Sequence, residues 1–335
     1  MNFNRCFKNF VIAASTVVMP FTSHASPIVI KFSHVVAQNT PKGQAADYFK
    51  KLAEERTNGR VKIEVYPNSQ LYQDKDEMEA LQLGAVQMLA PSLSKFALLG
   101  VKEFEVFDLP FIFDNYQELH KVTQGPIGAK LLVKLEQKGI HGLTYWDNGF
   151  KVLSANKPLK TPVDFRGQKM RIQSSRVLDS QMRSMGAIPQ VMAFSEVYQA
   201  LKTGVVNGTE NPPSNLYTQN MHEVQKYVIL SNHGYLGYAV IVNNKFWTGL
   251  PTDIRIILEG AMKDATKFAN DIAKKNNEEA LVAVKKSGKT LFITLTEQER
   301  SQWKKIMDKA HRDNMRRIGI DIVKDVYKET GYSPN

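Results

Sequence analysis

Two side chains in the stretch 165–213 have the chemistry needed to hold a small anion. Arg171 lies in a short alternating run, Lys169–Gln173, that is typical of a strand, and Asn211 lies in a turn rich in glycine and proline. An arginine guanidinium is planar and offers paired donors that match a carboxylate, and an asparagine amide adds a directional donor. We therefore predict that this stretch forms one wall of a cleft that binds a small carboxylate.

The sequence lacks the short motifs that mark common catalytic and metal sites. G-x-S-x-G, H-E-x-x-H, G-x-G-x-x-G and the P-loop do not occur. Gly288-Lys289-Thr290 resembles the end of a P-loop, but it lies between a predicted helix and a strand, the reverse of the order that phosphate binding needs. The seven histidines are scattered without ligand spacing. We expect no enzyme activity, cofactor or metal, although a dispersed Ser-His-Asp set stays open.

The first 25 residues have the pattern of a secretory signal. Arg5 and Lys8 precede an apolar run over 10–19, and the small-residue pattern that follows predicts cleavage after Ala25. The apolar run is about half of the ~20 residues needed to cross a bilayer. Cleavage would remove Cys6, the single cysteine, and would lower the formal net charge from +11 to +9. We expect a periplasmic protein without a covalent membrane anchor or a disulfide.

The positive net charge does not indicate nucleic-acid binding. Much of it lies in lysine-rich stretches near 274–275, 285–289 and 304–305, where acidic residues are interspersed. Such stretches are typical of solvated helix faces, and no basic-aromatic signature accompanies them. We predict no nucleic-acid partner.

The order of predicted elements indicates an α/β fold. Alternating strands and amphipathic helices are expected at 28–33 (strand), 41–57 (helix), 61–67 (strand), 74–83 (helix) and 86–90 (strand). This order implies parallel pairing with right-handed crossovers. The apolar segment 104–113 is expected to form a buried strand and turn.

The length of 335 residues suits about two domains. Asp147-Asn148-Gly149 is a turn signal, and we place the first crossing between domains there and the return near Tyr238. A single helix over about 252–287 would be on the order of 50 Å long, more than the ~30 Å of a small domain. We predict domain I at 26–148 and 238–276 and domain II at 149–237 and 277–335, with the long helix shared.

Several segments together resemble one family. In chain order they are SQL (69–71), NGFKVLSANKP (148–158), KMRIQ (169–173), MAFSEVYQALKTGVVNGTENP (192–212) and YAVIVNNKFW (238–247). The chain resembles the extracytoplasmic solute-binding proteins of TRAP transporters, DctP-type, C4-dicarboxylate-binding group. The resemblance covers essentially the whole mature chain. It implies a two-domain, periplasmic-binding-protein-like fold with crossing strands and a domain-spanning helix, and delivery of ligand to the small and large subunits of a TRAP permease.

The resemblance also implies roles for individual residues. The carboxylate-clamping arginine of the family falls on Arg171, its partnering asparagine on Asn211 and its ligand-packing aromatic on Phe194. The second cationic position of the family falls on Lys151, which offers a point charge in place of a fork. Ser92 falls where sialic-acid-binding members resemble one another in carrying an acid, and a serine there favours a small, doubly charged ligand.

The rest of the pocket and the identity of the ligand stay more open. Five residues either complete the pocket or pack in the core: His34, Gln73, His233, Tyr235 and Tyr238. A dicarboxylate sealed between domains needs both charges matched, because burying an unpaired carboxylate costs several kcal/mol. Arg171 would hold one end, and Lys151 with a neutral donor such as Ser92 or Tyr235 the other. We expect succinate, malate or fumarate; the alternatives are a keto or aromatic monocarboxylate, or a secreted enzyme that acts on a carboxylate.

Overall fold

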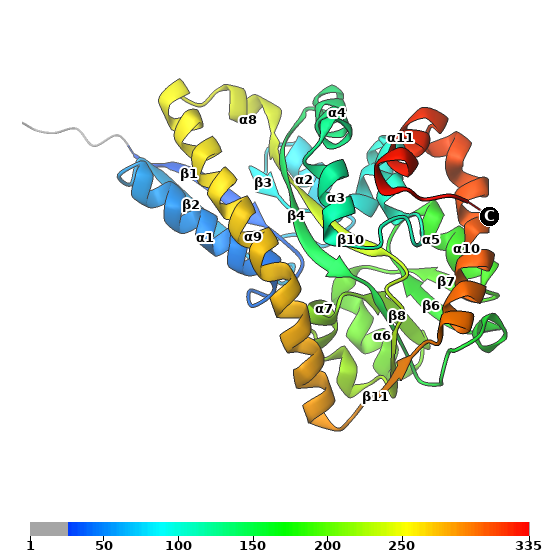
Figure 1. Cartoon of the computed structure of the whole chain (residues 1–335). Coiled ribbons are helices and arrows are strands. Elements are labelled where there is room, and N and C mark those ends of the chain that lie inside the picture. Colours follow the sequence, from blue (N-terminus) through cyan, green and yellow to red (C-terminus); the bar gives the residue numbers. More distant parts are fainter. Residues whose placement is uncertain (1–25, 335) are drawn as a thin grey trace, which may run out of the picture.

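Two separate β-sheets form the frame of the protein in the computed structural model, which describes residues 26–334. The predicted signal, 1–25, lies outside the described residues. The first sheet has the strand order β2-β1-β3-β10-β4, and the second has the order β11-β9-β5-β8-β6-β7. We call each sheet with the helices packed on it a lobe, the first lobe and the second lobe (Figure 1). The predicted two-domain α/β fold is confirmed.

The first sheet mixes parallel and antiparallel pairs. Its strands are β1 (Ile28–Ser33), β2 (Val61–Tyr66), β3 (Met88–Leu89), β4 (Ile140–Phe150) and β10 (Tyr235–Asn243). Strand β1 pairs in parallel with β2 and β3, as the strand–helix–strand order predicts. Strand β10 returns from the second lobe and runs antiparallel to β3 and β4.

Helices cover both faces of the first sheet. They are α1 (Pro41–Arg56), α2 (Glu77–Gln82), α3 (Tyr116–Thr123), α4 (Pro126–Lys134) and α8 (Asn244–Thr248), with 3-10 segments η1 (Leu93–Leu99), η2 (Lys102–Asp108) and η3 (Leu135–Lys138). On one face Phe32 and Trp146 of the sheet pack against Phe49 of α1 in one apolar core. On the other face Phe104 and Leu131 belong to a second core.

The predicted strand at 104–113 is wrong. The segment begins within η2, which carries Phe104 and Phe107 three residues apart, and such residues lie on one side of a 3-10 helix. Both rings are fully buried, so one side of the helix buries them without a partner strand. The apolar pattern identified the burial, but it did not distinguish a short helix from a strand.

The second lobe holds the stretch in which Arg171 lies. Its strands are β5 (Val152–Ala155), β6 (Lys169–Ile172), β7 (Ile188–Val191), β8 (Gly208–Asn211), β9 (Tyr227–Leu230) and β11 (Leu291–Thr294). Its helices are η4 (Pro162–Phe165), α5 (Arg176–Ser184), η5 (Phe194–Glu196), α6 (Val197–Thr203), α7 (Pro213–Thr218), η6 (Met221–Glu223) and α10 (Glu297–Ile318). Strand β6 pairs in parallel with β7 and β8, so Arg171 and Asn211 are carried on neighbouring strands.

The turn predicted at Asp147-Asn148-Gly149 is also wrong, because these residues lie within β4. The register with β10 shifts here: Leu236 faces Gly149 and Gly237 faces Asp147, so Asn148 is an extra residue in a β-bulge. Strand β4 then continues to Phe150 and passes into β5 of the second lobe. The turn-forming residues therefore bend the strand at the crossing.

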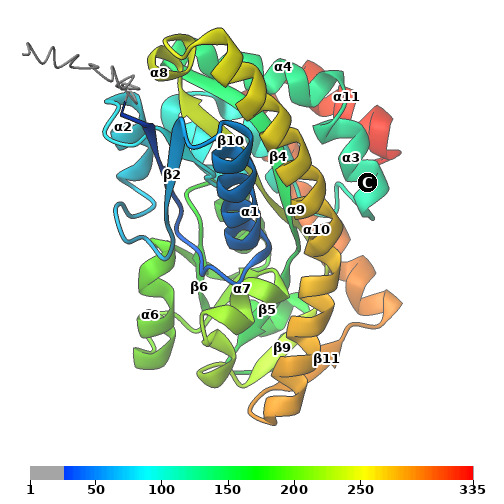
Figure 2. The same cartoon turned by 90° about the vertical axis from the view of Figure 1, so that its left-hand side faces the viewer.

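The long helix is confirmed. Helix α9 (Thr252–Ser287) has 36 residues and ends at Gly288, whose φ of +67° suits glycine. It packs against α1 and β4 in the first lobe and against α7 in the second. Figures 1 and 2 show it running from the end of the molecule near α8 to the end near β11. Gly260 does not break it.

The last helix lies with the first lobe, although the predicted second domain includes it. Helix α11 (Ile320–Thr330) packs against α3, α4 and η2, and its Ile322, Val323 and Val326 are part of the first-lobe core. Helix α10 contacts both α5 and η2, so the chain returns to the first lobe along it (Figure 1). The other domain boundaries stay a prediction.

Within residues 26–334, no helix combines the length and the apolar character needed to cross a membrane. The same residues contain no cluster of three or more His, Cys, Asp or Glu side chains arranged for a metal ion.

Candidate ligand-binding site between the lobes

A narrow cavity lies between the two lobes. Its lining comes from both sides: Val35, Val36, Asp74, Ser92, Lys95, Leu236 and Tyr238 from the first lobe, and Arg171, Gln173, Phe194, Asn211 and Asn215 from the second. A cavity walled by both lobes changes shape when the lobes move.

Arg171 is held rigidly in the wall. Its Nε and Nη2 donate hydrogen bonds of 3.1 and 2.9 Å to the carbonyl oxygen of Met192, and its guanidinium lies 5.7 Å from the centre of the Phe194 ring. Among the described residues, Nη1 makes no hydrogen bond. Burial lowers the pKa of Arg171, and the carboxylate of Asp74 opposes that shift. Arg171 is 2% exposed, so a charged donor is buried in the cavity wall.

A second cation, Lys95, reaches the same cavity from η1. Its ammonium pairs with Asp74 and lies 2.5 Å from a carboxylate oxygen of Glu77. Burial opposes the charge on Lys95, but the two carboxylates outweigh it and raise the pKa of Lys95. Lys95 therefore carries a positive charge that two acids from its own lobe hold in place.

The two acids beside Lys95 differ in how firmly each keeps its charge. Burial alone would raise the pKa of Asp74, but Lys95 and the backbone N–H of Phe194 lower it to about 2. Burial raises the pKa of Glu77, whose side chain is only 1% exposed. Asp74 is thus the firmly charged acid of the cavity, and Glu77 supports Lys95 from behind.

Two hydrogen bonds join the lobes across the cavity. The Ser92 hydroxyl donates to Oε1 of Gln173 at 2.5 Å, and the backbone N–H of Phe194 donates to Oδ2 of Asp74 at 2.5 Å. Each bond pairs a first-lobe residue with a second-lobe residue. The contacts that close the lobes therefore lie on the rim of the cavity.

Five of the ten predicted site residues line this one cavity: Ser92, Arg171, Phe194, Asn211 and Tyr238. Tyr238 is fixed by a 2.9 Å hydrogen bond from the Asn148 amide, and its ring carries the Lys42 ammonium 3.7 Å from its centre. The predicted role of these residues in ligand binding stays a prediction. Their shared position in space is what the structure adds.

Lys151, the predicted second cation, does not line the cavity. Its ammonium lies 2.7 Å from Oε1 of Glu210, and Oε2 of Glu210 lies 2.9 Å from Nε2 of His233. Burial alone would raise the pKa of Glu210, but Lys151 and His233 lower it to about 2. Ser231 completes the set at 2.7 Å from Nδ1 of His233. His233, also a predicted pocket residue, is therefore part of the same internal network.

The remaining three predicted residues also lie outside the cavity lining. Tyr235 donates a 2.7 Å hydrogen bond to Asp147 inside the first lobe. His34 is fully buried next to Phe32, and burial lowers its pKa to about 3, so the ring is neutral. The backbone carbonyl of Gln73 accepts hydrogen bonds from the start of α2. Loop position alone did not indicate which side chains face the ligand space.

The structure adds four polar lining residues that the sequence analysis did not predict for the site: Asp74, Lys95, Gln173 and Asn215. Gln173 lies two residues after Arg171, and alternate residues of a strand point to the same face. Lys95 follows Ser92 by three residues, which is one turn of a 3-10 helix. Those two spacings were detectable signals. Asp74, in a run of charged residues before α2, gave none.

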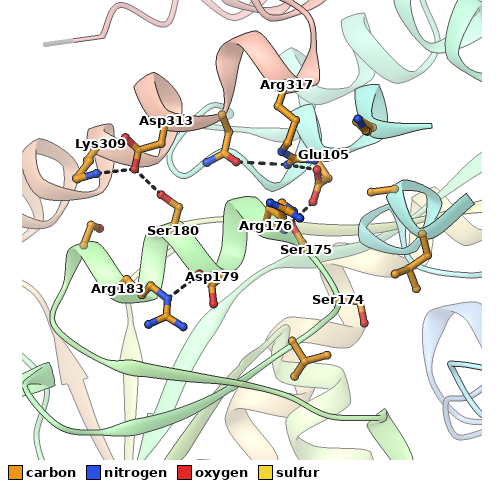
Figure 3. A pocket seen from close by; sticks show the side chains of 16 residues that line it. Glu105, Ser174, Ser175, Arg176, Asp179, Ser180, Arg183, Lys309, Asp313 and Arg317 are labelled. Carbon is orange, nitrogen blue, oxygen red and sulfur yellow. Dashed lines mark hydrogen bonds and ion pairs between the residues drawn. The ribbon is translucent and has the colours of Figure 1, made fainter. Parts of the chain in front are cut away.

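A larger groove of about 1140 Å³ between α5, α10 and η2 has a different character (Figure 3). Its charged side chains pair with one another, as in Arg183 with Asp179 and Lys309 with Asp313. Glu105 pairs with Arg317 and accepts the backbone N–H of Arg176 at 2.7 Å, as Figure 3 shows. Three of its five basic side chains are paired with acids, and the other two, Lys102 and Arg176, are exposed. The groove therefore has no buried cation like Arg171 among its described lining residues, and the cavity beside Arg171 is the better candidate.

Two α/β lobes joined by crossing strands, with a polar cavity between them, define the class of two-lobed solute-binding folds. The family model described as bacterial extracellular solute-binding protein, family 7 (DctP), matches residues 32–317, and the chain belongs to this family. The resemblance of the sequence motifs to DctP-type proteins is thereby confirmed.

Similar proteins are known from sequence and from structure. The C4-dicarboxylate-binding periplasmic protein DctP of Rhodobacter capsulatus is 63% identical over 306 residues, which cover 91% of this chain and 92% of that protein. A TRAP periplasmic solute-binding protein of Shewanella oneidensis with bound succinate is 41% identical, with a TM-score of 0.89 over 91% of this chain and 99% of that chain. Another from Pseudomonas aeruginosa PAO1 with bound L-malate is 43% identical, with a TM-score of 0.83 over 86% and 100%.

Proposed function

We propose that this protein is a periplasmic solute-binding protein that holds a C4-dicarboxylate between its lobes and delivers it to a TRAP membrane permease. The ligands in view are succinate, malate and fumarate. The names and bound ligands of the similar proteins support this proposal. The family match supports a periplasmic location and a permease partner.

The observation that carries the proposal is a pair of buried cations, one from each lobe, in the wall of one cavity. Arg171 and Lys95 both line it, and Asp74 is the acid that accompanies them there. A doubly charged anion would place one carboxylate near each cation, and its burial would then leave neither charge unmatched. Because the cations belong to different lobes, such a ligand would favour the closed arrangement.

The polarity beyond Arg171 favours a dicarboxylate over a monocarboxylate. The lining includes the polar side chains of Ser92, Lys95 and Asn215 besides Arg171. A monocarboxylate with an apolar tail would bury its tail against polar groups. Val35 and Leu236 supply apolar contact for a short carbon chain only.

Ligand screening tests the proposal directly. The mature chain is unfolded in the presence of succinate, L-malate, fumarate and butyrate, and calorimetry follows for every acid that stabilises it. A ligand at 100 times its dissociation constant adds about 2.7 kcal/mol to the free energy of unfolding. We expect this for the dicarboxylates and not for butyrate. Equal stabilisation by butyrate would favour the monocarboxylate alternative, and conversion of any acid to a product would favour an enzyme.

Export has a separate test. The protein recovered from the periplasm should begin at Ser26, which N-terminal sequencing reads directly. An uncleaved terminus would contradict the predicted processing and would leave the ligand proposal untouched.

A further inference from the structure

Asn215 places an unpartnered hydrogen-bond acceptor in the ligand cavity. The side chain lines the cavity and is 2% exposed, and among the described residues its Oδ1 has no hydrogen-bond partner. A buried polar atom without a partner is uncommon in a folded protein, because its desolvation is not compensated. The atom therefore has a place for a donor that the chain does not supply.

The neighbours of Asn215 fix its position. The amide group lies beside the Tyr238 hydroxyl, which accepts a 2.9 Å hydrogen bond from the Asn148 amide. The preceding residue, Ser214, donates its backbone N–H to Asn277 of α9 and its hydroxyl to Asn148, both at 2.9 Å. Asn215 is thus held at the start of α7 by contacts to the crossing strand and the long helix.

The side-chain oxygens of Asp74 and Gln173 in the wall are already occupied, and the two cations carry the opposite chemistry. Oδ2 of Asp74 accepts the Phe194 N–H and its Oδ1 pairs with Lys95, while Oε1 of Gln173 accepts from Ser92. Arg171 and Lys95 are donors only. A ligand carboxylate therefore finds donors in this cavity, whereas Asn215 Oδ1 needs a donor from the ligand.

We infer that Asn215 accepts a hydrogen bond from a hydroxyl group on the bound dicarboxylate, so that the cavity prefers a 2-hydroxy dicarboxylate over the unsubstituted acid. The inference rests on the proposed function, because it assumes a dicarboxylate in this cavity. A satisfied acceptor in place of an unsatisfied one corresponds to roughly a tenfold difference in affinity.

The test uses three acids of nearly equal size and charge: succinate, L-malate and fluorosuccinate. Fluorine is close to a hydroxyl in size but carries no donor hydrogen, so the pair separates hydrogen bonding from shape. Calorimetry on the wild type should give L-malate an affinity roughly ten times that of fluorosuccinate. In Asn215→Leu this ratio should fall to about one.

Two variants keep the test decisive. If Asn215→Leu does not fold, Asn215→Ala removes the same acceptor with less bulk. Thr218→Val serves as the matched control, because Thr218 is on the same helix and its hydroxyl donates only within it, to the Ser214 carbonyl at 2.8 Å; it should keep the wild-type ratio.

An unchanged ratio in the Asn215 variants, or a wild type that does not prefer L-malate, would overturn the inference. If the wild type bound none of the three acids, the proposed function itself would fail. The two failures are therefore distinguishable.

Discussion

Two buried clusters of charged side chains lie close together in this protein, and they differ in whether they line the cavity between the lobes. The first, Lys151 with Glu210 and His233, we call the closed cluster; the second, Arg171 with Lys95 and Asp74, we call the cavity cluster. Arg171, Lys151 and Lys95 are all at most 4% exposed, so burial does not separate the clusters. The two clusters differ in the partners of their cations. Lys151 and Glu210 neutralise each other, whereas the hydrogen bonds of Arg171 go to a neutral carbonyl.

The comparison teaches that a buried cation marks a ligand site only when its counter-charge is missing. Glu210 has a strongly lowered pKa although its network is internal, and Asp74 has a similarly lowered pKa at the cavity. Perturbed titration occurs in structural ion-pair networks as well as in functional sites. The cavity cluster is distinguished by Arg171, whose hydrogen bonds go to a neutral carbonyl, by its position on both lobes and by the space in front of it.

The largest expected effect on ligand affinity comes from removing the charge of Arg171. Arg171→Ala should weaken succinate binding by about 4 kcal/mol, roughly a thousandfold, because one ligand carboxylate would be buried without its partner. Calorimetry measures the affinity, and the melting temperature shows that the variant folds. Arg176→Ala is the matched control, because Arg176 contacts Glu105 through its backbone N–H and its side chain is exposed. Unchanged succinate affinity in Arg171→Ala would contradict the role of the cavity cluster.

The closed cluster should respond in stability and not in affinity. Lys151→Met leaves the buried carboxylate of Glu210 without its ammonium, which should lower the free energy of unfolding by about 3 kcal/mol. Denaturant unfolding measures the loss, and the double variant Lys151→Met with Glu210→Gln should recover most of it. Succinate affinity of the folded variant should stay within about threefold of the wild type. A loss of affinity as large as that of Arg171→Ala would show that Lys151 binds the ligand after all.

The second cation of the cavity cluster can be tested by removing its charge together with that of its nearest acid. Lys95→Met with Asp74→Asn keeps an acceptor for the Phe194 N–H and removes both charges. Succinate affinity should fall by about 2 kcal/mol, roughly thirtyfold, because only Arg171 remains for two carboxylates. Butyrate affinity should change little, since one cation suffices for one carboxylate. Lys102→Met with Asp313→Asn, in the groove of Figure 3, is the charge-matched control. Equal losses for succinate and butyrate would count against a second-carboxylate role for Lys95.

The same contrast explains what could be predicted from the sequence. Arg171 and Asn211 were predicted because one family motif carries each of them, and α9 because an uninterrupted helical pattern ends at Gly288. The partner of Lys151 could not be predicted, since Glu210 lies 59 residues away in the sequence and meets it only when β5 and β8 pair. Without that partner, Lys151 and Lys95 are equivalent as candidate cations. Only the fold shows that Lys151 is enclosed in an internal network, whereas Lys95, which is paired with Asp74 and Glu77, lines the cavity.

The smallest expected effect concerns the hydrogen bonds that join the two lobes at the cavity. The closed cluster has no such bond within the described residues. Ser92 donates to Gln173 across the lobes, whereas the bonds of the closed cluster do not cross the cavity. Ser92→Ala removes one such bond, and a net loss of about 1 kcal/mol should weaken succinate binding roughly fivefold, because only the closed form gains from it. The free energy of unfolding without ligand should change less than the affinity does. Calorimetry and denaturant unfolding on the same variant give the two numbers. An affinity equal to that of the wild type would mean that the Ser92 bond does not contribute to closure.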